Sequence, residues 1–156
     1  MEQKSSHENA VRWLYQQFLE WWNERNAAMM VALCRSNANL IGFDGSQMNG
    51  RAEINSELRD IFSRHQTGTY VWKINEVRML TSAVAILRAV AGMIPAGKSE
   101  IEPKINAVQT MVAVKSLGTW SIELFQNTPA AFDDAPELRE KFTKELRNVQ
   151  SKSLPS

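Results

Sequence analysis

The chain has a single cysteine, Cys34, and no long run of apolar residues. One cysteine excludes an internal disulfide and a metal site built from several thiolates, and such usage is typical of a reducing compartment. Nowhere do about 18 consecutive apolar residues suggest a membrane span, and the N-terminal residues lack the apolar core of a signal peptide. The sequence therefore predicts a cytoplasmic protein without a membrane span and without a metal site.

An excess of charge of one sign is missing as well. Eighteen Lys and Arg stand against 17 Asp and Glu, which leaves a formal net charge of +1. Proteins that are drawn to nucleic acids or anionic membranes by their electric field carry a marked positive excess. We therefore expect neither a nucleic acid nor a membrane as a partner. The 156 residues, 44% of them hydrophobic, suffice for one domain with a sizeable core.

The sequence motifs of several enzyme classes are also absent. The chain contains no HExxH, GxxxxGK[ST], GxGxxG, CxxC or GxSxG, so we expect no metal and no nucleotide cofactor, and indeed no cofactor at all. Only two histidines are present, His7 near the N-terminus and His65. A Ser-His-Asp site therefore has almost no candidate base, which disfavours nucleophilic hydrolysis.

The first seventy residues carry mainly helical signals. Apolar residues recur every three or four positions in two stretches, and a run of helix formers that is apolar nearly all round lies between them. This run contains Cys34, which we expect to be a buried helical thiol. Ser5 and Glu8 have the spacing of a capping box in front of the first stretch. We predict helices over residues 6–26, 27–35 and 51–68 and a short strand over residues 40–43.

Beyond Gly68 the pattern changes to β-branched and aromatic residues. Their runs predict strands over residues 69–80, 83–94, 105–115 and 119–128. The link between the last two runs suits a three-residue loop that pairs Lys115 with Thr119. This register predicts one mostly apolar face that ends in polar Gln126 and Asn106 and lines a pocket. The opposite face, which we expect to pack against a second copy of the chain, carries Gln109, Met111, Ser121, Glu123 and Phe125.

The last part of the chain returns to a helical pattern. Asp134 and Glu137 are spaced as a capping box, and apolar residues follow at helical spacing. We predict a C-terminal helix over residues 136–150 and a flexible tail over residues 151–156. Helices followed by a long antiparallel sheet make the fold class α+β, in one domain that spans the chain.

A few residues interrupt these patterns and are candidates for function. His65 follows the apolar stripe of the third helix, and is either a half-exposed histidine favoured by the helix dipole or a polar group in a pocket. Arg78 and Arg88 each interrupt an apolar strand, and alternation does not decide whether they face solvent or a ligand anion. Tryptophans are frequent and favour core packing; Trp22, at the end of the first stripe, could also line a cavity.

Five stretches of the chain carry a resemblance: Trp21-Trp22-Asn23, residues 50–54, residues 76–78, residues 106–110 and, most specifically, residues 120–129. Together they resemble one family, the SnoaL-like proteins of SgcJ/EcaC type. They belong to the nuclear-transport-factor-two-like superfamily. The resemblance covers residues 6–135 and implies a cone of curved antiparallel sheet, closed by N-terminal helices over a pocket, and a homodimer built on the sheet. One activity is not implied, because the same cone serves isomerases, cyclases, dehydratases, binding modules and transport adaptors.

The chain departs from its relatives at two positions that matter for catalysis. Many relatives carry an aspartate after the Trp-Asn segment, where this chain has residues 24–26, Glu-Arg-Asn. The general base of the ketosteroid isomerase branch falls here among Ile41, Gly42 and Phe43, none of which can accept a proton. The nearest carboxylate is Asp44, in the turn that follows. No residue of this chain therefore matches the general base, and the resemblance does not support isomerase chemistry.

Our leading hypothesis is a homodimer that binds a small, mostly apolar organic ligand in the pocket. The alternative is an acid/base enzyme, of isomerase, cyclase or dehydratase kind or associated with an oxidoreductase, that acts on a polyketide-like or aromatic substrate. In that case His65 or Asp44 would transfer the proton, and Gln126 or Asn106 would polarise an oxygen. A third reading is a structural dimer or adaptor with a filled cone. The predicted ligand-binding residues are Trp22, Phe43, Phe62, His65, Asn106, Val108 and Gln126.

Overall fold

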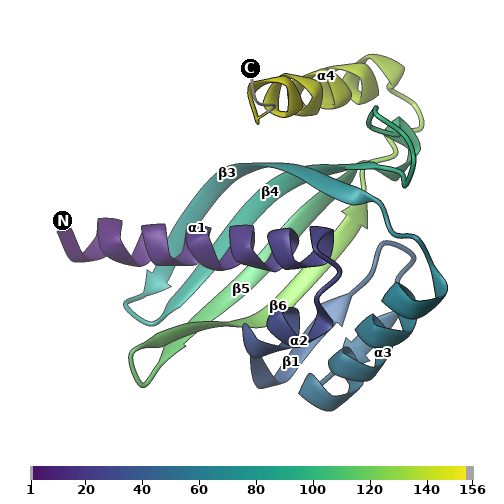
Figure 1. Cartoon of the computed structure of the whole chain (residues 1–156). Helices are drawn as coiled ribbons and strands as arrows, with labels where there is room; N and C mark the ends of the chain where they lie inside the picture. The colour runs from purple at the N-terminus through teal and green to yellow at the C-terminus, as the bar shows by residue number, and fades with distance from the viewer. Residues whose placement is uncertain (1, 154–156) are drawn as a thin grey trace.

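The computed structural model describes the backbone of residues 2–153 and the side chains of residues 6–152 (Figure 1). In chain order the elements are α1 (Glu2–Asn23), α2 (Ala27–Ala32), β1 (Cys34–Ile41), β2 (Gln47–Asn49), α3 (Arg51–Arg64), β3 (Thr69–Thr81), β4 (Val84–Ile94), the 3-10 helix η1 (Pro103–Ile105), β5 (Ala107–Ser116), β6 (Thr119–Pro129) and α4 (Pro136–Ser153). The predicted α+β class, the four long strands and the C-terminal helix are confirmed. None of the helices in this part of the chain has both the length and the apolar character needed to cross a membrane.

The element boundaries differ most at β1, which was predicted over residues 40–43 and extends from Cys34 to Ile41, and smaller differences occur at α1, α3 and α4. Helix α1 begins at Glu2, four residues earlier than predicted, and the side chain of Ser5 in the predicted capping box lies outside the described residues. Helix α4 continues to Ser153, so the predicted flexible tail starts inside a helix, and its last three positions are not among the described residues. Strand β2 was not predicted, because its three residues are too short for a recognisable alternation.

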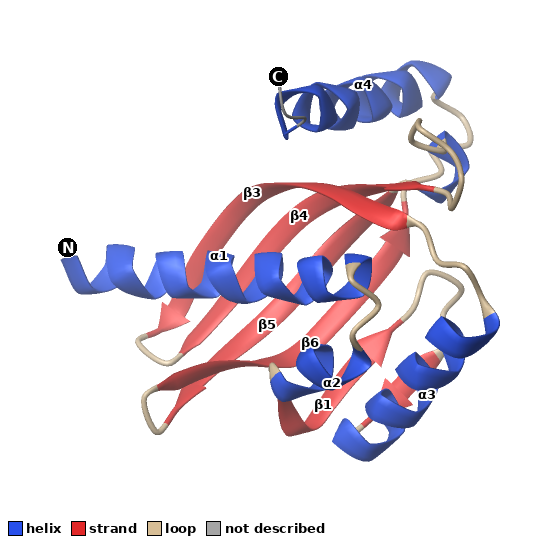
Figure 2. Cartoon of the chain, in the orientation of Figure 1, coloured by secondary structure: helices blue, strands red, loops and turns tan. Residues whose placement is uncertain are grey.

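The six strands form one curved sheet in the order β2-β1-β6-β5-β4-β3 (Figure 2). All neighbours are antiparallel except β1 and β6, which are parallel. Helix α1 lies across the sheet, and we call the face toward it the inner face and the opposite one the outer face. The inner face carries Leu87, Ala89, Gln109, Met111 and Phe125, whereas the outer face carries Ile86, Arg88, Thr110, Val112 and Leu124.

The main core lies between α1 and the inner face. The apolar stripe of α1, which consists of Val11, Leu14, Tyr15, Phe18 and Leu19, is buried to 2% exposure or less. This spacing of three and four residues places all five side chains on one side of a helix. Small side chains let the helix approach the centre of the sheet closely, and the buried alanines of the inner face are Ala85, Ala89, Ala91, Ala107 and Ala113.

The hairpin between β5 and β6 differs from the predicted one in the length of its loop and in its register. Ser116 pairs with Thr119, so the loop has two residues, Leu117 and Gly118, with φ angles of 51° and 80°. Positive φ at both positions is the geometry of a type I′ turn, which matches the twist of a hairpin. A bulge between Val112 and Ala113 shifts the register again. The register predicted from a three-residue loop is therefore wrong.

The face that was predicted to meet a second copy of the chain is the inner face of the sheet for most of its length. Gln109, Met111 and Phe125 are 0%, 0% and 4% exposed beneath α1, so they cannot meet a second copy of the chain. Apolar residues occupy both faces of these strands, and alternation alone could not decide which face was covered. Polar Gln109 is tolerated in the core because Tyr15 donates a hydrogen bond to it and it donates one to Asn127.

Cys34 is buried as predicted, but it begins β1 instead of lying in a helix. Helix α2 ends at Ala32, and the backbone N–H of Leu33 bonds to the carbonyl of Met30 at 3.1 Å. The thiol is 4% exposed and donates to the Met30 carbonyl at 3.5 Å. Burial raises the pKa of the Cys34 thiol to about 12, although the charge of Arg51 acts in the opposite direction.

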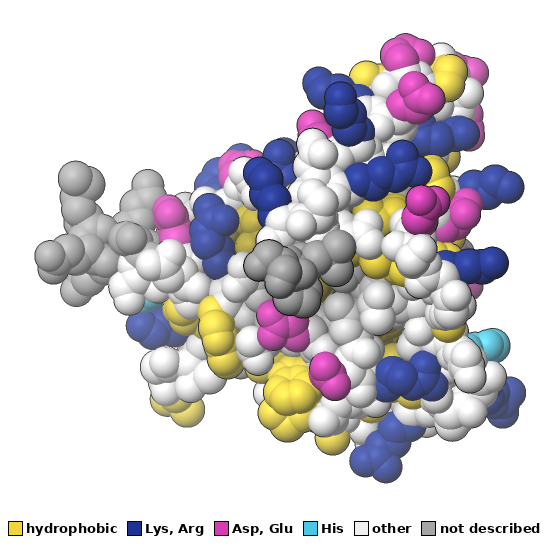
Figure 3. All heavy atoms as spheres, turned by 45° about the horizontal axis from the view of Figure 1, so that its top comes forward, with side chains coloured by type: hydrophobic (Ala, Val, Ile, Leu, Met, Phe, Trp, Pro, Cys, Tyr) yellow, Lys and Arg dark blue, Asp and Glu magenta, His cyan; other side chains and the backbone are white. Residues whose placement is uncertain are grey.

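Helix α4 covers one end of the outer face and builds a second core there. Its Phe142 and Leu146 pack with Val90, Ile101 and Ala130. Asn106 donates a hydrogen bond to Thr143 at 2.8 Å and ties the helix to the sheet. On the face turned forward in Figure 3, basic and acidic side chains are interspersed, in keeping with the small net charge of the chain.

Candidate functional site

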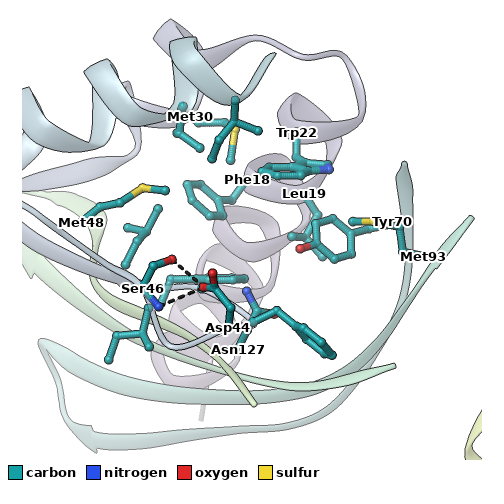
Figure 4. Close-up of a pocket in the computed structure, with 17 residues that line it drawn as sticks. Phe18, Leu19, Trp22, Met30, Asp44, Ser46, Met48, Tyr70, Met93 and Asn127 are labelled. Atoms are coloured by element: carbon teal, nitrogen blue, oxygen red, sulfur yellow. Dashed lines mark hydrogen bonds between the residues drawn. The ribbon is translucent and has the colours of Figure 1, made fainter. Parts of the chain in front are cut away.

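A cavity of about 350 Å³ opens between the end of α1, helices α2 and α3, and the strands β1 and β2 (Figure 4). Its wall is mostly apolar and aromatic. Helices provide Phe18, Leu19, Trp22, Met30, Leu58 and Ile61; strands provide Leu40, Ile41, Met48, Tyr70, Met93, Phe125 and Asn127; and the loop after β1 provides Gly42, Phe43, Asp44 and Ser46.

The end of α1 fixes one wall of this cavity. Trp22 donates an indole hydrogen bond to the carbonyl of Gly68 at 3.0 Å, and this bond sets the orientation of its ring. Gly68 has no room for a side chain, because a Cβ there would lie 2.6 Å from the carbonyl oxygen of Ile94. The neighbouring Asn23 bonds to the backbone of Tyr70, which holds the start of β3 against the helix. The Trp-Asn segment of the sequence thus builds the junction between α1 and the cavity.

A chain of buried polar side chains leads from the core to the cavity. The Tyr15 hydroxyl donates to Gln109 at 2.5 Å, and the Gln109 amide nitrogen donates to Asn127 Oδ1 at 2.7 Å. Tyr70 closes the chain beside Asn127 in the wall of the cavity. Protein surrounds Tyr70, so burial raises the pKa of its phenol to about 12, and a hydrogen bond from the Asn127 side chain lowers it by a smaller amount. The hydroxyl is therefore a neutral hydrogen-bond donor at physiological pH.

Asp44 lies in the exposed turn at the mouth of the cavity. Its Oδ1 accepts hydrogen bonds from the Ser46 hydroxyl at 2.6 Å and from the Ser46 backbone N–H at 3.0 Å. These bonds stabilise the charged form, and they hold the pKa of the Asp44 carboxyl below its ordinary value. Asp44 is the one charged residue among the described residues that line the cavity. The site therefore combines an ionised carboxylate at its mouth with neutral donors deeper in its wall.

Three of the predicted site residues meet at this cavity. Trp22, Phe43 and Asp44 line it. Phe62 does not, but its ring packs edge-on against Trp22 with 5.1 Å between the ring centroids, so it supports the wall from behind. His65 lies outside the cavity, because α3 ends at Arg64 and the exposed histidine that follows adopts an extended backbone conformation.

The other predicted residues lie on the far side of the sheet. Gln126 pairs with Thr110 on the outer face. Val108 packs against the second core beneath α4. Asn106 is buried there, and its side-chain amide donates a hydrogen bond to Thr143. The predicted grouping of Val108 and Gln126 on one face is correct, but that face was assigned to the pocket although apolar residues occupy both faces of these strands. Arg78 and Arg88, whose direction was open, also lie on the outer face, 3.7 and 3.6 Å from Glu76.

Sequence reasoning missed Tyr70 and Asn127, the polar residues that the structure places in the wall. Asn127 lies in the segment that carries the resemblance, one position after the predicted Gln126, and the correct choice of the covered sheet face would have pointed to it. Tyr70 resembles any aromatic strand residue, and only the curvature of the sheet brings it from β3 to Asn127 on β6. No local sequence signal identifies such a contact.

Arg25 is another residue that sequence reasoning missed, and it joins α1 to α3. It follows α1 with a φ of 58°, the left-handed conformation that often ends a helix. Its guanidinium donates to Thr67 Oγ1 at 2.9 Å, to the carbonyl of His65 at 2.8 Å and to the carbonyl of Phe62. A positive charge at the free carbonyls of a helix end is favourable. Arg25 therefore supports the cavity wall without entering it.

Comparison with known proteins shows the class of fold. No protein-family model and no curated protein matches the sequence. Solved structures do: a domain with a cystatin-like fold from Nostoc punctiforme superposes with a TM-score of 0.76 at 23% identity, over 92% of each chain. A putative scytalone dehydratase from Novosphingobium aromaticivorans gives 0.69 at 13% identity over 83% of this chain and 87% of that one. A protein from Shewanella oneidensis similar to nuclear transport factor two gives 0.64 at 17% identity, over 77% and 97%.

The chain therefore has an α+β fold of the cystatin-like, or nuclear-transport-factor-two-like, type. In this chain, α1 packs on the inner face of the six-stranded curved sheet and α4 packs on the outer face. The fold positions a cavity but does not assign its use, since folds of this breadth accommodate unrelated activities. Function has to be argued from the cavity itself.

Proposed function

We propose that this chain binds a small, mostly apolar organic ligand in the cavity beside α1. The observation that carries the proposal is the cavity itself, whose volume of about 350 Å³ falls in the range of ligand sites. Ligand pockets typically have apolar and aromatic walls with a few polar groups that orient the ligand. Here Tyr70, Asn127 and Asp44 are those polar groups.

Binding of N-phenyl-1-naphthylamine, a neutral apolar dye that fluoresces in apolar surroundings, tests this proposal. We expect saturable fluorescence enhancement with the wild-type protein. Ile41→Trp puts a large ring into the cavity and should abolish the signal, whereas Leu80→Trp, at an exposed position outside the lining, should leave it unchanged. Absence of dye binding, or equal binding by Ile41→Trp and wild type in their folded states, would overturn the proposal.

We further propose that the chain is a SnoaL-like protein of SgcJ/EcaC type and forms a homodimer through the outer face. The part of this face beyond α4 carries half-buried apolar residues, namely Val84, Ile86, Val112, Val114 and Leu124. Charged side chains lie beside them, with Arg88 and Arg78 near Glu76 and Arg35 bonded to Glu123 at 2.7 Å. An apolar centre with charged surroundings is the usual composition of a protein interface.

Light scattering at micromolar concentration tests the dimer. We expect twice the chain mass of 17.7 kDa. Val112→Glu places a charge in the centre of the apolar patch and should give the single-chain mass, while Ser116→Glu, at the exposed hairpin, should remain dimeric. A wild-type mass of one chain would contradict the assembly and leave the cavity proposal intact.

Asp44 favours a second candidate function, acid/base catalysis of the isomerase, cyclase or dehydratase kind. Its carboxylate is ionised, lies at the cavity mouth and could accept a proton from a ligand held by neutral donors. Exchange of the α protons of 2-tetralone in D₂O, followed by NMR, tests this function. We expect Asp44→Asn to slow exchange at least about 100-fold and His65→Ala, outside the cavity, to have no effect. Exchange at the buffer rate in wild type would exclude the candidate.

A further inference from the structure

We propose that the ligand of this cavity is a neutral ring compound with a hydrogen-bond-accepting oxygen, a ketone or quinone, held by Tyr70 and Asn127. This inference rests on the proposed binding function and specifies the ligand class. It is carried by the direction of the hydrogen bonds in the wall, by the charge of the lining and by the kind of side chain that surrounds the space.

The hydrogen bonds in the wall leave donors directed at the ligand. Gln109 donates to Asn127 Oδ1, so the Asn127 amide presents its nitrogen on its other side, where one of its two hydrogens goes to Tyr70 and the other is left for a ligand. In the described part of the chain, the Tyr70 hydroxyl donates to no side chain or carbonyl, while its oxygen accepts from Asn127. Tyr70 and Asn127 both point into the cavity in Figure 4. The Tyr70 hydroxyl and the Asn127 amide nitrogen can therefore each donate a hydrogen bond to one ligand oxygen that has two lone pairs.

The charge of the lining selects against anions. The described residues of the wall include no Lys, Arg or His, and the one charged group is the Asp44 carboxylate. A ligand carboxylate or phosphate would lose its water without gaining a cation, and Asp44 would repel it. The acceptor oxygen must therefore belong to an uncharged group.

The side chains around the space favour a flat ring over a flexible chain. Phe18, Trp22 and Phe125 supply three aromatic rings from α1 and β6. Phe18 and Phe125 lie 4.9 Å apart at their centroids, and Trp22 lies 5.5 Å from Tyr70, so the rings are held by one another. A rigid aromatic or fused-ring ligand loses little conformational freedom on entering such a space.

Displacement of the naphthylamine dye by three ligands with the same bicyclic skeleton tests the inference. The ligands are the ketone 1-tetralone, the hydrocarbon tetralin, which lacks the oxygen, and the anion 1,2,3,4-tetrahydro-1-naphthoate. We expect tetralone to bind about tenfold more tightly than tetralin, since one hydrogen bond contributes on the order of 1 kcal/mol. Tyr70→Phe removes one of the two donors and should reduce this advantage without changing tetralin binding. Asp44→Asn should strengthen binding of the anion several-fold and leave tetralone unchanged.

A carbon-13 label on the tetralone carbonyl gives an independent readout. Hydrogen bonding moves this resonance downfield, so we expect a bound signal downfield of the free one in wild type and a smaller displacement in Tyr70→Phe. Equal affinities for tetralone and tetralin, tighter binding of the anion, or an unchanged carbonyl signal in the variant would overturn the ligand class. Dye binding that is blocked by Ile41→Trp would still uphold the binding function in that case, whereas a protein that binds no dye fails both.

Discussion

The side-chain amide of Asn23 bonds to both backbone polar groups of Tyr70, with Nδ2 donating to the carbonyl at 3.2 Å and Oδ1 accepting from the N–H at 2.7 Å. Strand β3 is the last strand of the sheet, and at this residue its free edge would otherwise present unpaired groups. The amide takes the place of a neighbouring strand. It also couples the end of α1 to the residue whose hydroxyl faces the cavity.

Replacement of Asn23 by alanine should therefore destabilise the fold. The change removes two hydrogen bonds and leaves the partly buried N–H of Tyr70 without an acceptor, which costs about 1–3 kcal/mol. Urea unfolding measures the loss. Asn9→Ala, at an exposed position of α1, is the control and should stay within about 0.5 kcal/mol of wild type. Equal stability of Asn23→Ala and Asn9→Ala would show that the amide pair is unimportant.

The hairpin turn offers a stabilising substitution. Leu117 is fully exposed and has a φ of 51°, a conformation that costs an ordinary side chain roughly 1–2 kcal/mol. Leu117→Asn keeps the turn and suits this conformation, so we expect a gain of about 0.5–1 kcal/mol and a melting temperature up to about 4 °C higher. Thermal unfolding measures it. Leu80→Asn, at another exposed leucine, should bring no gain in stability. A gain of similar size there would mean that replacing an exposed leucine by a polar residue, and not the turn conformation, stabilises the protein.

Two substitutions of Arg25 separate its backbone role from its side-chain role. Arg25→Ala loses the bonds to the end of α3 and keeps a side chain at positive φ, whereas Arg25→Gly loses the same bonds and relieves the backbone. We expect both variants to be less stable than wild type and the glycine variant to be about 1 kcal/mol more stable than the alanine variant. Chemical denaturation ranks the three proteins. An alanine variant as stable as wild type would mean that the guanidinium contributes nothing.

The buried thiol predicts a pH dependence of stability. The Cys34 pKa is about 12 in the folded chain and near 9.0 when unperturbed, so between these values the unfolded chain has released a proton that the folded chain keeps. The free energy of unfolding is unaffected by this group below pH 9 and falls above it, by at most about 1.4 kcal/mol per pH unit. We expect urea unfolding at pH 8 and pH 10 to show a larger loss for wild type than for Cys34→Ala. Equal losses would show that the thiol titrates normally.

The strands and helices could be predicted because their patterns are local, but the covered face of the sheet could not. On β5 both faces are apolar, with Val108 and Val112 on the outer face and Ala107 and Met111 on the inner one. Size was the better signal, because small alanines mark the face that a helix approaches. The bulge near Val112 and the type I′ turn each moved the register, and neither has a strong signature when the first turn residue is leucine.

The cavity was predictable only in part for a related reason. Trp22 lies at the end of a helical stripe, and Asp44 lies in a turn after a strand; both are visible in the sequence and both line the cavity. Tyr70 and Asn127 come from strands that are not neighbours in the sheet. Their meeting depends on curvature, and curvature depends on the packing of all strands around α1.

Three methionines, Met30, Met48 and Met93, reach the cavity wall from three different elements. An unbranched thioether side chain can change rotamer at little cost, so the wall can adjust to ligands of somewhat different outline. Met48 and Met93 are only half-buried, so their sulfur atoms are accessible to oxidants, and each sulfoxide would place a strong dipole where the wall is now apolar. Exposure to peroxide would then weaken binding of apolar molecules, and enzymatic reduction of the sulfoxides would restore it.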